Sequence, residues 1–358
     1  MTKNQYLKEK VKAIEVKKKS ISQLLKEMED TGFQGRKLAE IVTTWEKMIK
    51  DKDLTIVLGY AGSLSTTGQW KIINWLIENR FIDILVATGA NLSEDIVEAM
   101  GYSYWKGSHL ANDADLLKSD INRYYDVYGS EIDYMEMTEL IGRFIVENLK
   151  ENYPYSSREF FYLFGNWLRK KGINSIVATA SKFKVPVFCP AIVDSPYGDG
   201  GLIAKSKGFN LILDNMKDYI EFMSLGAKIK ETGVIYIGGG VPKDFIQLLA
   251  VTSNLLYPER KIPGRKPPIV RLKKEIKQLV ETYYPHKYAI QITTDSPQWG
   301  GLSGCTFEEA TSWGKEKIDA LKVQCYCDAT IALPIVIHAL NERIKTKRKG
   351  NDFSFLFK

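Results

Sequence analysis

Residues 55–68 read TIVLGYAGSLSTTG, and this stretch decides the fold class. Its first five residues form a short apolar run that is typical of a buried strand. Glycines and hydroxyl side chains follow at once, and we expect a helix to begin near Gln69. A short strand, a glycine-rich turn and a helix make up one unit of a βα fold. The stretch therefore predicts an α/β architecture.

Five further apolar runs have the same character, each followed by a turn and an amphipathic segment. They span residues 82–86, 185–189, 233–237, 288–292 and 323–327. Strands that alternate with segments of helical length predict a doubly wound, mostly parallel, Rossmann-like sheet that is covered on both faces. Ligands of such folds bind beyond the carboxyl ends of the strands, so we expect the functional residues there.

The remaining parts of the chain frame this sheet. Residues 1–50 are predicted to be an N-terminal helical region outside the main sheet, because residues 4–50 are rich in Lys, Glu and Leu at helical spacing. Residues 51–345 are predicted to form the α/β domain, with residues 346–358 as a C-terminal tail. Residues 260–277 hold eight basic residues and one acid, which indicates a solvated surface excursion or a patch for an acidic partner.

Composition narrows the function classes. The 358 residues are 44% hydrophobic and 26% charged, the balance of a soluble globular protein, and the net charge of +7 does not by itself indicate nucleic acid. No apolar run approaches the roughly 18 residues that span a membrane, and the first 20 residues lack the hydrophobic core of a secretion signal. The three histidines and four cysteines lack metal-ligand spacing, so we expect no metal site and free thiols.

The strand ends carry polar and glycine-rich segments that have both a functional and a plain structural interpretation. The loop 59–68 suits a phosphate cradle, but also a tight turn. Ser93 is a possible helix N-cap, which would place Glu94 in a first helical turn without any ligand. The three glycines at 238–240 would allow a ligand to approach the backbone closely. Residues 194–201 are ordinary turn residues, and Asp328 is a possible N-cap.

Residues 306–315 read TFEEATSWGK. Thr306 and Glu309 fit a capping box, so Glu309 has a structural role available. Trp313 follows Glu309 by four residues and shares its helix face, whereas Lys315 shares it only if the helix breaks at Gly314. A lone lysine is most often a solvated surface group, so these residues alone do not single out Lys315.

Together these segments resemble deoxyhypusine synthase, from LGYAGSLSTTG near residue 58 to about residue 340. The most specific element runs from Ser312 to Thr330, where SWGK is followed by IDA and YCDAT. The resemblance implies an NAD-dependent transferase that oxidises spermidine, releases 1,3-diaminopropane and passes the 4-aminobutyl group through a lysine imine to an acceptor amine. It also implies a cytoplasmic homotetramer with sites shared across a subunit interface.

The family's functional positions fall on the strand ends described above. The polyamine positions fall on Asp199, Glu309 and Trp313, and the imine-forming lysine falls on Lys315. This amine can attack only when neutral, so we expect a dry pocket, walled by Trp313, or nearby cations. The NAD positions fall on Gly62, Ser63, Thr66, Thr88, Gly89, Ala90, Glu94, Asp194, Gly239, Thr294, Asp328 and Ala329.

The chain also departs from the family pattern. Asp244 stands where the family usually has a histidine, and Gly300-Gly301-Leu302 stands where it has an aspartate. Residues 255–287 form a basic insertion that we expect to be dispensable for cofactor binding. These departures leave the acceptor open: a protein lysine, as the family name implies, or a free diamine such as putrescine, which would make the chain a homospermidine synthase. A non-catalytic nucleotide-binding scaffold is the third hypothesis, although it would need neither Glu309, Trp313 nor Lys315.

Overall fold

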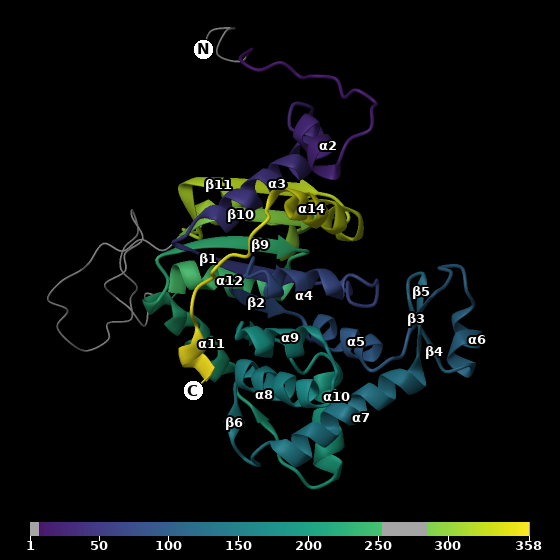
Figure 1. Ribbon diagram of the computed structural model, residues 1–358. Coiled ribbons are helices and arrows are strands. Elements are labelled where there is room, and N and C mark those ends of the chain that lie inside the picture. Colours follow the sequence, from purple (N-terminus) through teal and green to yellow (C-terminus); the bar gives the residue numbers. More distant parts are fainter. Residues whose placement is uncertain (1–6, 253–284, 358) are drawn as a thin grey trace, which may run out of the picture.

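A six-stranded parallel sheet forms the centre of the computed structural model, which describes residues 7–252 and 285–357 (Figure 1). Its strands are β1 (Leu54–Tyr60), β2 (Ile84–Ala87), β7 (Val187–Phe188), β9 (Glu231–Ile237), β10 (His286–Thr293) and β11 (Glu316–Tyr326). They lie in the order β11-β10-β9-β1-β2-β7, and each neighbouring pair is parallel. All six predicted strand segments are strands of this sheet, so the predicted fold class is confirmed.

The strand order defines where a ligand crevice can form. Numbered along the sheet's own strands, the order is 6-5-4-1-2-3, the arrangement of dinucleotide-binding α/β folds. From β1 the chain winds outward through β2 to β7, and from β9 it winds the other way through β10 to β11. The turns that follow β1 and β9 therefore diverge to opposite faces and leave a gap between them. This switch point is the expected ligand position.

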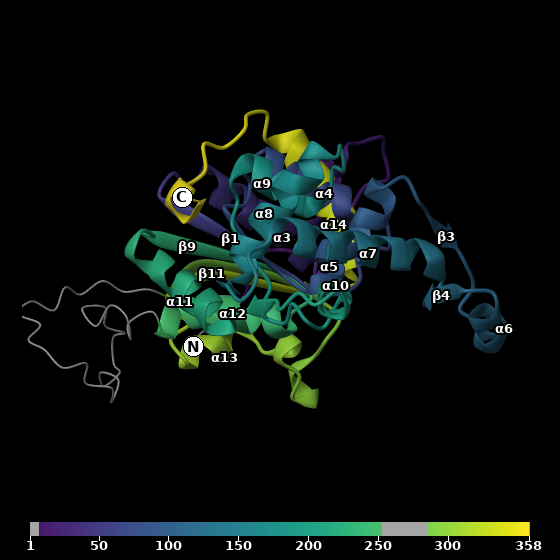
Figure 2. The ribbon, with the colours of Figure 1, turned by 90° about the horizontal axis from the view of Figure 1, so that it is seen from below.

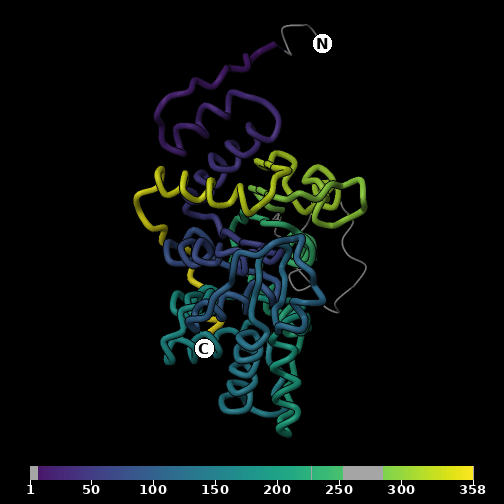
Figure 3. The backbone as a smooth tube through the Cα atoms, turned by 90° about the vertical axis from the view of Figure 1, so that its right-hand side faces the viewer, coloured from purple at the N-terminus to yellow at the C-terminus, as the bar shows by residue number. Residues whose placement is uncertain are grey.

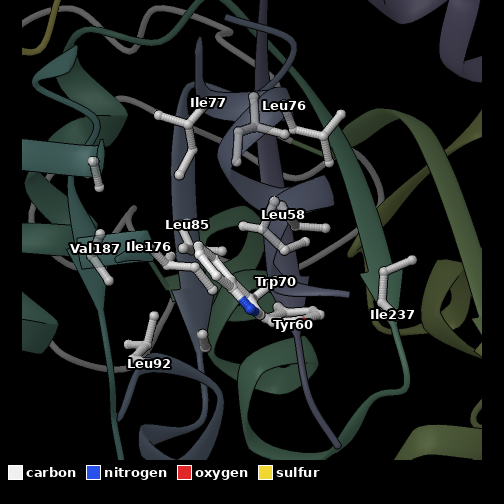
Figure 4. Close-up of a cluster of buried hydrophobic side chains, with 14 of the residues drawn as sticks. Leu58, Tyr60, Trp70, Leu76, Ile77, Leu85, Leu92, Ile176, Val187 and Ile237 are labelled. Atoms are coloured by element: carbon white, nitrogen blue, oxygen red, sulfur yellow. The ribbon is translucent and has the colours of Figure 1, made fainter. Parts of the chain in front are cut away.

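Side chains alternate between two helical layers, as the pleat of a strand requires. Leu54, Ile56, Leu58 and Tyr60 face a core closed mainly by α3 (Phe33–Lys50), α4 (Trp70–Glu78), α5 (Gly89–Ala99), α9 (Ile176–Phe183) and α14 (Ala329–Arg343). Figure 4 shows Leu58 and Tyr60 beside Trp70, Leu76 and Ile77 of α4. Further out on the β7 side lie α7 (Glu131–Asn148), α8 (Ser157–Lys170) and α10 (Pro196–Ser206).

The opposite face is covered by α11 (Asn215–Ser224), α12 (Gly240–Thr252) and α13 (Phe307–Ser312). Val57 and Tyr236 point to this side, where they pack with Phe245 and Ile246 of α12. Gly59 also faces α12: a Cβ atom there would lie 2.9 Å from the Tyr236 ring and 3.1 Å from Ile246. The absence of a side chain at Gly59 therefore lets α12 pack closely on β1.

Two small sheets escaped sequence analysis. An antiparallel sheet of β3 (Tyr104–Lys106), β5 (Val127–Ser130) and β4 (Ile121–Tyr124), with α6 (Asp113–Lys118), projects from the body (Figure 2). A two-stranded parallel sheet joins β6 (Pro154–Tyr155) to β8 (Ile212–Leu213). These strands have two to four residues each and are mostly not fully buried, so they lack the continuous apolar runs that reveal the central strands.

The N-terminal helices are shorter than predicted. Helices occupy residues 21–28 (α2, Ile21–Met28) and 33–50 (α3), whereas residues 7–20 contain no helix. Ser20 is the N-cap of α2, and its hydroxyl accepts a hydrogen bond from the Gln23 backbone in a capping box. In the segment before it, Leu7, Val11 and Val16 are exposed, so no packing of these side chains supports a helix there. Figure 3 shows this purple N-terminal part beside the yellow α14, and the Ser22 backbone donates to Glu342 at 2.7 Å.

The C-terminal tail crosses the amino-terminal edge of β1. Arg348 forms a buried ion pair with Asp83 at 2.7 Å, and the Asn351 amide donates to the Thr55 hydroxyl at 2.7 Å. A short 3-10 helix, η5 (Ser354–Phe357), follows. The predicted basic insertion, residues 255–287, lies outside the described residues except for its last three. No helix within the described ranges is long and apolar enough to cross a membrane.

Candidate active site

The two glycine-rich turns predicted to face one crevice lie side by side at the switch point. The Ala61 backbone donates to the Ile237 carbonyl at 3.0 Å, directly beyond the paired ends of β1 and β9. A Cβ atom on Gly238 would lie 3.4 Å from Ala61. Gly62 and Gly238 have φ angles of +92° and +72°, which glycine adopts without strain. The backbone at this crevice is thus bare and shaped by glycine.

Hydroxyl groups of the turn after β1 form hydrogen bonds with one another and with the carboxylate of Glu94. The Ser63 hydroxyl lies 3.0 Å from the Thr66 hydroxyl and donates to the Glu94 carboxylate at 3.0 Å. The Thr66 hydroxyl also lies 2.9 Å from the Ser63 carbonyl, to which it can donate. The predicted cofactor positions Ser63, Thr66 and Glu94 are therefore brought together at the switch point.

Hydrogen bonds of Asn91 in α5 stabilise this turn, and Asn91 was not among the predicted site residues. Its amide donates to the Gly62 carbonyl at 2.5 Å, and its side-chain oxygen accepts from the Leu64 backbone at 3.1 Å. The Ser65 hydroxyl donates to the Asn91 carbonyl at 2.8 Å. Asn91 is fully buried, and a buried polar side chain whose partners lie about 27 positions away leaves no signal in the local sequence.

Glu94 lies in the body of α5 rather than in a first turn. The helix begins at Gly89 with Thr88 at the N-cap, and the Ser93 hydroxyl donates to the Gly89 carbonyl, so Ser93 is not the cap. Glu94 is only 5% exposed, and burial raises its pKa to about 7 against the hydrogen bond from Ser63. Capping therefore does not explain Glu94, which is a buried acid aimed at the Gly62–Thr66 turn.

The projecting sheet supplies a tyrosine cluster beside Glu94. The Tyr104 hydroxyl donates to the Glu94 carbonyl at 3.1 Å, and the Tyr104 and Tyr124 rings meet edge to face at 5.9 Å. Burial first, then the charges of Asp199 and Glu94, raise the pKa of Tyr134 in α7 to about 12. The charges of Asp199 and Glu94 both act on Tyr134, and Asp199 itself is exposed at the start of α10.

The remaining predicted cofactor positions surround the carboxyl ends of the strands. A Cβ atom on Gly89 would lie 2.2 Å from the Ser195 hydroxyl, so the absence of a side chain at Gly89 lets the start of α5 pack against Ser195. Ala90 follows Gly89 in α5, and the exposed Asp194 precedes Ser195. Thr294 follows β10 and is exposed. Asp328 caps α14, accepting from the Thr330 backbone at 2.7 Å, and Ala329 begins that helix. The capping interpretation of Asp328 is therefore confirmed.

Lys315 lies apart from these residues, where α12 packs against the end of α13; we call the surroundings of its amine the Lys315 pocket. The chain turns inward because α13 ends at Ser312 and Gly314 adopts a φ of +79°. The Gly314 backbone then donates to Thr311 at 2.9 Å and the Lys315 backbone to Ala310 at 3.0 Å, which is a Schellman cap. Lys315 is 8% exposed, so it is not the solvated surface group that a lone lysine most often is.

Two side chains of α12 bind the Lys315 ammonium. Its Nζ atom donates to Asp244 Oδ1 and to Gln247 Oε1, each at 3.2 Å. It also lies 5.6 Å from the centre of the Trp313 ring. Trp313 is 57% exposed, so it lines only one side of the amine and leaves the pocket open there. Asp244, at the position that departs from the family pattern, therefore contacts the proposed nucleophile directly.

Lys243 connects the pocket to the glycine turn and was missed by sequence analysis. Its buried Nζ atom donates to Gln291 at 2.9 Å and to the Cys305 carbonyl at 2.7 Å, between the Tyr236 and Phe307 rings. Burial lowers the pKa of Lys243 to about 8, and the charge of Lys315 adds to that shift. Lys243 is thus a second buried cation near Lys315.

The turn at Gly239 packs on the segment that carries the second departure. A Cβ atom on Gly239 would lie 2.4 Å from the Ser303 backbone, within the 3-10 helix η4 (Leu302–Gly304). Leu302 itself is 38% exposed. A carboxylate is nevertheless present, because a Cβ atom on Gly301 would lie 2.5 Å from the Asp295 side chain. Gly239 itself is packed tightly against Ser303, so a side chain at position 239 has no room.

Glu309 remains available at the mouth of the pocket. The Thr306 hydroxyl accepts from the Glu309 backbone at 3.0 Å, but within the described residues the reciprocal bond of a capping box is absent. Glu309 is exposed, and its carboxylate adds to the burial that raises the pKa of the Cys305 thiol. In the described part of the chain, no hydrogen bond or ion pair joins Asp199 to Glu309, Trp313 or Lys315. The charge of Asp199 instead acts on Tyr134 of α7.

Known proteins carry the same sequence features. Residues 23–340 match the family model of deoxyhypusine synthase. A Methanosarcina mazei protein named "Probable deoxyhypusine synthase 2" is 45% identical over 345 residues, covering 96% of this chain and 93% of that protein. A Chlorobaculum tepidum "Deoxyhypusine synthase-like protein" is 34% identical, covering 99% of this chain and 96% of that protein.

A solved structure shares the fold. The crystal structure of a protein from Entamoeba histolytica, provisionally assigned as a deoxyhypusine synthase, aligns with a TM-score of 0.60. It has 16% sequence identity to this chain, and the alignment covers 93% of this chain and 97% of that one. At this identity the likeness concerns the fold alone.

Proposed function

The chain belongs to the deoxyhypusine synthase family and is therefore a transferase, and we propose that it is an NAD-dependent 4-aminobutyl transferase with Lys315 as its covalent nucleophile. The observation that carries the proposal is the buried Lys315 amine, which contacts Asp244 and Gln247 beside Trp313. Spermidine is the proposed donor. A primary amine in such a pocket can attack an imine carbon and take over the aminobutyl group.

The switch-point crevice fits NAD by its own construction. Glycine turns leave the backbone open at Gly62 and Gly238, helices α4 and α5 begin there, and the buried Glu94 offers a carboxylate for a hydroxyl group. The chemistry that NAD supplies when bound is reversible hydride acceptance, which activates an amine carbon without net oxidation. We propose that Ser63, Thr66, Glu94 and Asp328 hold it, with Thr88–Ala90, Asp194, Gly239, Thr294 and Ala329 along the crevice.

The acidic side chains suit a polycation. Glu309 and Asp244 lie at the mouth of the Lys315 pocket, and the exposed ring of Trp313 can pack on an alkyl stem or an ammonium group. Asp199 lies apart from them, and its charge acts on Tyr134. If Asp199 also binds polyamine, we expect it to act on a site that a partner subunit completes. This is a reason to propose the homotetramer that the family resemblance implies, which light scattering would test.

The scaffold hypothesis is disfavoured by the burial of Lys315. An ammonium that is 8% exposed loses hydration, and a protein that only binds nucleotide gains nothing from that cost. The acceptor remains a choice between two amines. A protein lysine is the acceptor that the family name implies, whereas Asp244 adds a carboxylate beside the nucleophile and favours a small dication such as putrescine.

One experiment tests the function and separates the acceptors. The purified protein is incubated with NAD and labelled spermidine, then reduced with borohydride, and the labelled peptide is identified by mass spectrometry. We expect label on Lys315, and labelled homospermidine on adding putrescine if the free diamine is the acceptor. Transfer only to a protein lysine would support the first acceptor. Absence of any adduct and any released 1,3-diaminopropane would contradict the proposed function.

A further inference from the structure

Two polar side chains lie deeper in the protein than the Lys315 amine. Gln247 and Glu316 are both fully buried behind the amine. Gln247 accepts from Lys315 Nζ at 3.2 Å through Oε1 and donates from Nε2 to Glu316 Oε1 at 3.3 Å. One amide therefore bridges the nucleophile on one side and a buried carboxyl group on the other.

The chemistry of the two ends fixes the orientation of this amide. An ammonium can only donate hydrogen bonds and an ionised carboxylate can only accept them. Gln247 must then present its oxygen to Lys315 and its NH₂ group to Glu316. With the NH₂ group held by Glu316, Gln247 does not donate to the lone pair of a neutral Lys315 amine, so that lone pair stays free for attack.

We propose that Gln247 and Glu316 form a positioning pair, which holds the Lys315 amine with its lone pair free and sets the pH at which this amine becomes neutral. The inference rests on the proposed function in that Lys315 is taken as the nucleophile. Neither residue touches the open side of the pocket, where Asp244 and Trp313 lie. They act through Lys315 rather than on a substrate.

The charges around Glu316 decide the direction of its effect. Burial raises the pKa of Glu316 to about 7, against the hydrogen bond from Gln247 and the charges of Lys243, Lys315 and Lys322. His286 of β10 stays neutral at working pH, because burial lowers its pKa to about 3. Burial and the Glu316 charge raise the pKa of Tyr236 of β9, which therefore also stays neutral. Glu316, and Lys243 with a pKa of about 8, titrate closest to neutral pH, and burial raises the pKa of the nearby Cys305 thiol.

An ionised Glu316 favours the charged form of Lys315, and a protonated Glu316 does not. The second carboxylate near the amine, Asp244, has a side chain that is 40% exposed, so solvent screens it more strongly than it screens Glu316. The buried acid should therefore control the protonation of Lys315 more strongly than the exposed acid, although Asp244 contacts the amine directly.

The test is Glu316→Gln, which keeps the shape and a hydrogen-bonding partner for Gln247 but removes the charge. We expect the pH at which borohydride-trapped adduct on Lys315 reaches half its maximum to fall by about one unit. Wild type and variant should converge below about pH 7, where Glu316 is already protonated. Asp244→Asn should give a smaller shift. Glu308 lies in the same helix as Glu309, and its side chain is 75% exposed. Glu308→Gln should therefore give no shift.

A second readout keeps the inference separate from the proposed function. The rate at which acetic anhydride modifies Lys315 is measured against pH in the full-length protein without spermidine, because only the neutral amine reacts. The same downward shift is expected in Glu316→Gln. If the shift appears but spermidine never labels wild-type Lys315, the proposed function fails and the positioning pair stands. If adduct forms but neither profile moves, the pair fails alone.

Gln247→Met covers the case in which Glu316→Gln does not fold. This variant keeps the volume of the side chain and removes the bridge, so slower adduct formation is expected at every pH, with a Lys315 acetylation profile that differs from wild type. Adduct formation and acetylation indistinguishable from wild type in Gln247→Met would overturn the proposal. So would a Lys315 that is equally unreactive toward acetic anhydride in all of these proteins.

Discussion

The crevice beyond β1 and β9 and the pocket around Lys315 lie on the same sheet but are assembled differently. In the crevice, Ser63 meets Glu94 over 31 positions of the chain; Ser63 lies in the turn after β1 and Glu94 in the helix after β2, and these strands are neighbours in the sheet. In the pocket, Lys315 precedes a strand and meets Asp244 over 71 positions. The crevice thus follows from sheet topology, whereas the pocket depends on how α12 packs against the cap of α13.

This difference explains what each region can do. Short links between adjacent βα units give the crevice a rigid backbone, which suits a cofactor that stays bound. The pocket instead brings together three charged groups, Lys243 and Asp244 of α12 and Lys315 of the turn after α13, so its chemistry depends on their mutual electrostatics. Mutations should accordingly act on binding and stability in the crevice, and on reactivity in the pocket.

The largest expected effect would come from removing the proposed nucleophile. Lys315→Ala should lower transfer by roughly 10⁴-fold or more, because no imine can form without the amine. NAD affinity and the melting temperature should stay near those of wild type, since the crevice is not touched. Lys315→Arg should be almost as inactive, because a guanidinium keeps its charge and offers no usable lone pair. Borohydride trapping with labelled spermidine measures the loss.

Slow spermidine oxidation without adduct would still agree with this assignment, because the first hydride transfer precedes attachment. Full activity in Lys315→Ala, or label on a different lysine, would break the division between the two regions. The pocket would then be structural, and the nucleophile would have to be sought elsewhere.

A smaller effect, on stability rather than chemistry, is expected from the buried acid of the crevice. The pKa of Glu94 is raised to about 7 in the folded protein from 4.5, so its contribution to stability is present below about pH 4.5 and is lost as the pH rises through 7. At pH 8 the loss amounts to about 3 kcal/mol. Glu94→Gln should remove this loss, because glutamine carries no charge to bury. The melting temperature should therefore rise at pH 8, whereas it should hardly change at pH 4.5.

The same variant should weaken NAD binding if Glu94 is a cofactor residue, so stability and affinity would move in opposite directions. Calorimetric melting at both pH values and NAD titration at pH 8 measure the two effects. Glu308→Gln, an exposed acid, is the control for a general charge effect. A melting temperature of Glu94→Gln that is lower than wild type at pH 8 would contradict the buried-acid account.

The contact between the two regions can be tested at Gly239. An alanine there would collide with the Ser303 backbone, which carries a carbonyl acceptor for Gln291 at 2.7 Å. We expect Gly239→Ala to destabilise the fold by about 1–3 kcal/mol and to reduce both NAD affinity and transfer. Gly35→Ala in α3, where the nearest atom lies at 3.5 Å, should be neutral or slightly stabilising. If Gly239→Ala and Gly35→Ala changed the melting temperature equally, the close contact of Gly239 with Ser303 would not matter for stability.

The two regions also differ in how far sequence could predict them. The six strands and the ligand edge followed from apolar runs and glycine turns, because sheet topology places consecutive strand ends together. The partners of Lys315 did not follow, because no local pattern reveals that residues 243–247 pack on residue 315. Asn91 and Lys243 were missed since a buried polar side chain has no periodic signal. Lys315 itself was singled out only by the resemblance of its SWGK segment.

The smallest effect concerns Asp328, where the structural and functional interpretations coexist. Its carboxylate caps α14 by accepting from the Thr330 backbone at 2.7 Å, and Asp328→Ala should cost about 1 kcal/mol through loss of that cap alone. Asp328→Asn should keep the cap, because asparagine caps as well as aspartate, while removing the charge offered to a cofactor.

If Asp328 binds NAD, both variants should weaken NAD binding although only the alanine variant melts earlier. If Asp328 only caps the helix, Asp328→Asn should match wild type in both measurements. The pair of variants thus shows whether the far end of the crevice, at β11, shares in cofactor binding or whether that function is confined to the loops of β1, β2 and β9.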